Sequence, residues 1–180
     1  GKQPQLLLFK QHEQTFNREN YQAAYKQVVQ PFNERPRGGD RRGGDDHSPQ
    51  ELKQLVVYLN DKEMLPAVFF VFSRAKVMES AKRLARVMKF KTDVHKINRL
   101  FDQMTATIDR SDLLLPQIVE VKELLMKGIA VHHAGLLPFL KEIVEVLFSQ
   151  GDVHVLFATE TFAMGINMPT KTVIFPSLQK

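Results

Sequence analysis

The sequence predicts an α/β fold, in which a parallel sheet carries crossover helices on both faces. Four short apolar runs are typical of strands buried in such a sheet: residues 67–72, 129–132, 153–158 and 171–175. The segments between these runs are helical in pattern or tightly structured, as crossover connections are. A chain of 180 residues with 43% hydrophobic content can bury one core of this size, so we expect a single main domain.

Ahead of this domain, residues 1–31 predict a short strand, LLLFK, and a helix that leads into the domain. Residues 32–47 are rich in glycine, proline and charge, which predicts a disordered linker. Arg-Gly-Gly repeats like those in this linker also occur in segments that bind RNA. Acidic residues nearly cancel its arginines, however, and favour a plain solvated linker.

The domain itself, residues 48–180, opens with a strong signal for a helix. Ser48 supplies a cap, Pro49 suits the first helical position, and Glu51 follows three residues after the serine. Beyond the first strand, the segment 73–89 is amphipathic at helical period. Its apolar side is formed by Val77, Leu84 and Met88.

Residues 89–127 are a long helical insertion between the first and second strands. They predict two helices, residues 93–108 and 115–128, with Gly128 as the C-cap of the second. We expect the insertion to pack through its apolar side chains. Its solvated polar face is expected to carry Asp93, His95, Lys96, Arg99 and Asp102. One more helix, residues 138–151, joins the second strand to the third.

The composition excludes several classes of protein. Without cysteine the chain has neither disulfides nor thiolate zinc sites, and nothing argues for an oxidising compartment. No apolar run approaches the roughly 20 residues that span a bilayer, and the amino-terminal apolar run is too short for a secretory signal. We therefore expect a soluble intracellular protein with no membrane partner. The formal net charge of +5 favours an anionic partner such as nucleic acid.

Polar residues follow the predicted strands at their carboxyl ends, where open α/β sheets bind ligands. Ser73 can cap the next helix, and Arg74 lies in that helix's first turn, where a cation is disfavoured unless an anion occupies the helix end. Thr159 and Thr161 offer hydroxyl and backbone N–H groups of the kind that hold phosphate oxygens. Each of these residues is also compatible with an ordinary cap or turn.

The pair His132-His133 raises the question of a metal site. Adjacent strand residues point to opposite faces, and no third ligand is suitably spaced, so we expect no metal site. His133 is better explained as a polar side chain that orients the turn after it. Gly135 in that turn either lets the backbone approach a ligand closely or simply makes the turn.

The sequence contains, in this order, the stretches AVFFVFSR, GIAVHHAGLLPFLKEIVEVLFSQG and VHVLFATETFAMGINMPTKTVIF. Together they resemble the second RecA-like domain of superfamily 2 helicases, and specifically the Ski2-like group. The resemblance covers residues 65–180. Two exosome-linked branches of the group share LLP.LKE and LFATETFAMG.N.P. The stretches KEMLPAVFFVFSR and TVIFPSLQK, with the Arg-Gly-Gly linker, resemble the branch of the cytoplasmic superkiller (Ski) complex more than the nuclear branch.

This resemblance implies part of an ATP-dependent RNA helicase that unwinds RNA and feeds it 3'-to-5' into the exosome for decay. The implied partners are single-stranded RNA, Ski complex subunits and the RNA exosome, in the cytoplasm. The implied cofactors are ATP and Mg²⁺, held mainly by a first RecA-like domain. Because the chain has neither a G-x-x-x-x-G-K-[ST] loop nor an Asp-Glu-x-His motif, we expect no catalytic residue in it and no ATP hydrolysis by it alone.

The resemblance also implies roles for individual residues. It places RNA-backbone contacts at Ser73, Arg74, His133, Gly135, Lys141, Thr159 and Thr161. The family often has arginine at the position of Lys141, and lysine keeps the charge but loses the bidentate fork. Gly165 and Asn167 would face the nucleotide cleft, so that ATETFAMGINMP couples the two ligands. Two alternatives remain: the nuclear exosome branch, and a non-catalytic interaction domain that keeps a RecA-like fold.

Overall fold

The computed structural model describes residues 49–71, 73–106, 108–109, 111–159, 162 and 169–175. These residues all belong to one of the two units into which the chain divides, residues 45–180. The predicted strand, helix and linker before Ser48, and the Ser48 cap itself, lie outside the described residues. So do three of the predicted site residues: Thr161, Gly165 and Asn167.

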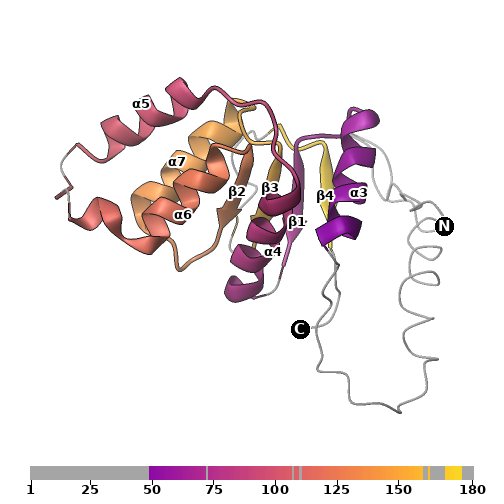
Figure 1. Ribbon diagram of the computed structural model, residues 1–180, viewed down its shortest axis with the longest axis horizontal. Coiled ribbons are helices and arrows are strands. Elements are labelled where there is room, and N and C mark those ends of the chain that lie inside the picture. Colours follow the sequence, from indigo (N-terminus) through magenta and orange to yellow (C-terminus); the bar gives the residue numbers. More distant parts are fainter. Residues whose placement is uncertain are drawn as a thin grey trace, which may run out of the picture. The chain divides into compact units, whose positions relative to one another are not determined.

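A sheet of four parallel strands, in the order β2-β3-β1-β4, forms the centre of the described unit (Figure 1). The strands are β1 (Ala67–Phe70), β2 (Ile129–His132), β3 (Val155–Ala158) and β4 (Thr172–Ile174). Every residue of β1, β2 and β3 is buried, as the continuous apolar runs predict. The parallel α/β fold is thus confirmed.

The strands are shorter than the apolar runs that predicted them. After β1, the Val71 amide still donates to the Ala158 carbonyl at 2.8 Å, but Ser73 already caps the next helix. Before β3, Val153 is buried as a loop residue. Burial of an apolar side chain therefore extends beyond the hydrogen-bonded ladder at β3, whereas Val71 after β1 is only partly buried.

The predicted helices of the domain are all present, each somewhat shorter than its apolar pattern. The described helices are α3 (Pro49–Asp61), α4 (Arg74–Val87), α5 (Val94–Met104), α6 (Pro116–Leu125) and α7 (Pro138–Ser149), with a short 3₁₀ turn η1 (Asp112–Leu114) before α6. In α4, Val77 and Leu84 are buried as predicted. Met88 is only partly buried, because it is the extended C-cap residue rather than part of the helical face.

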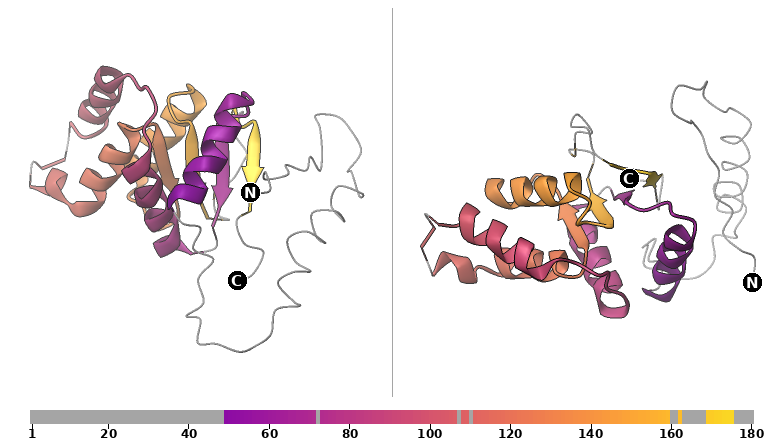
Figure 2. Two further views of the ribbon diagram at one scale, coloured as in Figure 1. Left: turned by 45° about the vertical axis from the view of Figure 1, so that its right-hand side comes forward. Right: turned by 90° about the horizontal axis from the view of Figure 1, so that it is seen from above.

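Helices cover both faces of the sheet, as predicted. The connection from β1 to β2 crosses the sheet in one direction, and that from β2 to β3 returns in the other. Since such crossovers are right-handed in nearly all proteins, opposite directions place their helices on opposite faces. Seen from above, α7 lies on one side of the sheet and α4, with α3, on the other (Figure 2).

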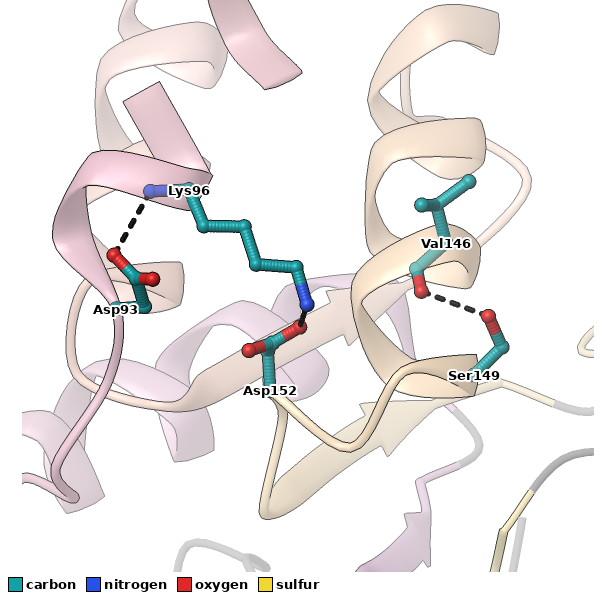
Figure 3. Close-up of polar contacts among 5 residues, drawn as sticks. All are labelled: Asp93, Lys96, Val146, Ser149 and Asp152. Atoms are coloured by element: carbon teal, nitrogen blue, oxygen red, sulfur yellow. Dashed lines mark hydrogen bonds and ion pairs between the residues drawn. The ribbon is translucent and has the colours of Figure 1, made fainter. Parts of the chain in front are cut away.

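The insertion is fixed at the amino edge of the sheet. Asp93 caps α5 by accepting the Lys96 N–H at 3.0 Å, and the Lys96 Nζ lies 2.5 Å from Oδ2 of Asp152, which precedes β3 (Figure 3). On the other side of α5, Ile97 and Phe101 are buried. The expected solvated face is confirmed at four positions and is broken at Lys96 by this ion pair. The four exposed residues are Asp93, His95, Arg99 and Asp102.

The return from the insertion into β2 depends on Gly128. Helix α6 ends at Leu125, three residues before the predicted cap, but Gly128 reverses the chain with a φ of 73°. An added Cβ there would lie 2.9 Å from the Phe90 Cβ and 3.0 Å from the His154 Nδ1. Glycine is therefore required by both backbone conformation and space.

Candidate nucleic-acid interface

The carboxyl ends of β2, β3 and β1 lie side by side, because β3 pairs with both of the other strands. The Thr159 amide donates to the His132 carbonyl at 3.1 Å, and the Val71 amide to the Ala158 carbonyl at 2.8 Å. Three chain segments thus leave the sheet from one edge. They carry most of the described residues that the sequence nominated as a site.

Arg74 and the turn after β2 come together at this edge. Arg74 begins α4 and is exposed. Its Cδ lies 3.7 Å from the position that a Cβ on Gly135 would occupy. The Gly135 amide donates to the His133 Nδ1 at 3.1 Å, so His133 orients the turn as predicted. The structure therefore joins Arg74, His133 and Gly135 in one cluster, although 59 positions separate Arg74 from His133 (133 minus 74).

Electrostatics keep His133 neutral and leave the cluster positive. Burial lowers the pKa of His133, and the charges of Arg74 and His132 lower it further. Because its Nδ1 accepts the Gly135 N–H, the neutral ring carries its proton on Nε2. Arg74 adds a cation at the amino end of α4, where the helix dipole is already positive. Such an end favours an anion such as a phosphate oxygen.

Ser73 and Thr159 already make hydrogen bonds within the protein. Ser73 is the N-cap of α4, and its Oγ accepts the Lys76 N–H at 3.5 Å. Thr159 is 5% exposed, and its N–H belongs to the sheet through the His132 carbonyl. The sequence offered the backbone N–H of Thr159 as a phosphate donor. That amide is instead the last rung between β3 and β2.

Lys141 occupies a different place from the other predicted site residues. It lies near the start of α7 and is partly buried. Its charge lowers the pKa of His132, after the larger effect of burial. Among the contacts of the described residues, none joins Lys141 to Arg74, His133 or Gly135.

Gln117 is a residue of this region that the sequence did not identify. The Gln117 Nε2 donates to the Gly135 carbonyl at 3.0 Å, while its Oε1 accepts the Leu137 N–H at 2.9 Å. In the sequence, Gln117 lies near the start of the helix predicted over residues 115–128, and no other role was predicted for it. The partners of Gln117 lie 18 and 20 positions away, so the local periodicity of the sequence cannot predict these contacts.

Phe162, one of the few described residues of the ATETFAMGINMP stretch, packs against the body of the domain. It is buried at 4% exposure, and its ring meets His132 edge-on at 4.8 Å and Phe148 of α7 at 6.3 Å between centroids. His132 is itself held by Glu145, with 2.8 Å between its Nε2 and the Glu145 Oε1. The aromatic residue within the predicted coupling motif is thus a packing anchor, which its sequence context did not reveal.

Mg²⁺ is one of the two cofactors that the resemblance implies. No group of three or more His, Asp or Glu side chains in the described part of the chain could hold a metal ion. The two residues expected to face the nucleotide, Gly165 and Asn167, lie outside it. Within the same residues, none of the helices combines the length and apolar character needed to cross a bilayer.

Comparison with known proteins gives a consistent set of relatives, although no family model matches the chain. Over 140 residues, or 76% of the chain, it is 45% identical to the antiviral helicase SKI2 of Saccharomyces cerevisiae. It is 44% identical over 77% of its length to human superkiller complex protein 2. The ATP-dependent RNA helicase mtr4 of Schizosaccharomyces pombe is 34% identical over 92% of the chain.

These relatives are much longer than the chain, which spans 11% of the two superkiller proteins and 16% of the mtr4 helicase. The names of these relatives agree with the family that the ordered motifs resemble. The parallel α/β sheet is consistent with a RecA-like domain of such a helicase. The chain therefore belongs, as a segment, to the Ski2-like family of DExH RNA helicases.

Proposed function

We propose that this chain grips the backbone of single-stranded RNA within an ATP-dependent helicase. The observation that carries the proposal is the cluster of Arg74 with the turn that contains His133 and Gly135, at the shared edge of three strands. Among the described residues no carboxylate pairs with Arg74, so its charge is available to a phosphate. Charge at a helix amino end suits that ligand.

The family resemblance supplies the remaining contacts of the proposal. Thr159, Thr161 and Lys141 would hold further phosphates, and Gly165 and Asn167 would line the nucleotide cleft. When bound, ATP would supply the free energy of its hydrolysis, and Mg²⁺ would neutralise charge on its phosphates. This chain contributes the grip on RNA and the ATETFAMGINMP link toward the nucleotide. Within this link, Phe162 packs against His132 at the end of β2.

Phosphate contacts carry no base information, which defines the test. In the full-length protein, Arg74→Ala combined with Thr159→Ala should weaken binding to two unrelated single-stranded RNAs equally. We expect at least about tenfold, since a hydrogen bond to a charged group contributes roughly 1.5–3 kcal/mol. Arg86→Ala, which removes an exposed cation from the last turn of the same helix, is the control. Equal affinity of the double variant and the wild type would overturn the proposal.

For the whole protein we propose that RNA is unwound and fed 3'-to-5' into the exosome, in the cytoplasm and with Ski complex subunits. The support is the higher identity to the superkiller proteins, 44–45%, than to the Mtr4-named helicases, 34–36%. One observation favours the nuclear alternative: the Mtr4-named relatives match 92% of the chain. Imaging the tagged full-length protein separates the two, because nuclear accumulation contradicts the cytoplasmic assignment.

A further inference from the structure

The turn between β2 and α7 has little backbone hydrogen bonding of its own. Within it, the Leu136 amide donates to the His133 carbonyl at 3.1 Å, and the Gly135 amide uses the His133 ring. Leu137 occupies the N-cap position of α7, where a leucine side chain offers no acceptor. The turn therefore needs an outside partner to fix its shape.

Gln117 is that partner. Its amide reaches both sides of the turn, donating to the Gly135 carbonyl and accepting the Leu137 N–H at 3.0 Å and 2.9 Å. One planar group thus sets the spacing between residues 135 and 137. A side-chain amide can satisfy a donor and an acceptor at once, which a carboxylate or an ammonium group cannot.

The helix that carries Gln117 is tied to the helix that carries Arg74. Lys82 of α4 pairs with Glu120 of α6 at 2.6 Å, and the Lys127 Nζ donates to the Ala85 carbonyl at 2.9 Å. Through α6, Gln117 holds the turn at a fixed place relative to the first residue of α4. The two halves of the Arg74 cluster are joined in this way.

From these contacts we infer that Gln117 is a positioning residue for RNA binding, an inference that rests on the proposed function. Gln117 acts through the turn rather than on the RNA. It keeps the Gly135 backbone and the His133 ring close enough to Arg74 for one RNA backbone to contact both the turn and Arg74. Through Gln117, the helical insertion between β1 and β2 contacts the interface.

The test uses Gln117→Met in the full-length protein, which removes both hydrogen bonds and adds no charge. Single-stranded RNA affinity should fall about threefold to tenfold, a range typical of lost positioning rather than lost contact. The salt dependence of binding should stay unchanged, because no phosphate contact is removed. Gln103→Met, the same chemical change at an exposed site on α5, is the matched control and should bind as the wild type does.

A double-mutant cycle distinguishes positioning from direct contact. If Gln117 acts by placing the turn against Arg74, Gln117→Met should lose most of its effect in an Arg74→Ala background. Independent, additive effects would contradict the inference. So would a Gln117→Met variant that melts at a lower temperature but binds RNA as tightly as Gln103→Met, since that result assigns Gln117 a structural role alone.

The same assays separate this inference from the proposed function. If Arg74→Ala with Thr159→Ala weakens RNA binding while Gln117→Met does not, the positioning role is wrong and the proposed function stands. If neither variant weakens binding, the proposed function is wrong and the positioning role falls with it.

Discussion

His133 reports on the charge at the interface, because its pKa is lowered by burial and then by the charge of Arg74. Removing that charge in Arg74→Ala should make protonation of the ring easier and raise the pKa of His133. An NMR titration of the ring measures the change, and Arg86→Ala should leave the pKa where it is in the wild type. If His133 titrates identically in all three proteins, Arg74 does not lie beside the turn in solution.

Three histidines give the fold a predicted pH dependence. Burial lowers the pKa values of His132, His133 and His154 below the ordinary 6.5. Between the lowered values and 6.5 the unfolded chain binds more protons than the folded one, so the free energy of unfolding rises with pH. The stabilising contribution is fully present above 6.5 and is lost as pH falls through the folded-state pKa values.

The measurement is the melting temperature of the protein between pH 7.5 and pH 5.5, which we expect to fall toward acid. His154→Phe should make the fall shallower, since it removes one of the three groups. The phenyl ring can also keep the stacking on Phe90, whose ring centroid lies 4.6 Å away. An equally steep fall in this variant would show that His154 does not contribute.

At the scale of elements, Gly128 and Gly151, which both have positive φ, separate backbone strain from crowding. Gly128 and Gly151 have φ of 73° and 80°, but an added Cβ meets close neighbours only at Gly128. Alanine at either site incurs the cost of a left-handed conformation, about 1–2 kcal/mol. Gly128→Ala should lose roughly 1–3 kcal/mol more from overpacking against Phe90 and His154. Denaturant unfolding of the two variants measures the difference, and equal losses would contradict the crowding.

The elements and their order along the chain were predictable from the sequence, because helices show local periodicity and the buried strands are continuous apolar runs. The carboxyl ends of the strands were predictable to within two residues, which is why Arg74 and His133 could be nominated. Contacts across the sheet were not predictable. The hydrogen bond from the Thr159 amide to the His132 carbonyl depends on the spatial order of the strands, and the hydrogen bonds of Gln117 depend on how α6 packs. The Lys96 ion pair with Asp152 joins residues 56 positions apart.

At the scale of the whole molecule, the chain is expected to be only part of a motor. It has no phosphate-binding loop and no Asp-Glu-x-His motif in its sequence. The purified chain of 180 residues should therefore show no ATP hydrolysis above buffer, with or without single-stranded RNA. A phosphate-release assay with the full-length protein as positive control tests this. RNA-stimulated turnover by the chain alone would mean that it holds a complete nucleotide site.

The salt dependence of RNA binding measures whether the strand ends grip an RNA backbone. In the full-length protein, the plot of log affinity against log salt concentration should lose about 0.7 of slope for each phosphate contact removed from a single strand. Arg74→Ala should lose that amount, while Arg86→Ala should keep the slope of the wild type. If Arg74→Ala keeps the full slope, Arg74 does not contact the RNA backbone, and the proposed grip of the strand ends on RNA is wrong.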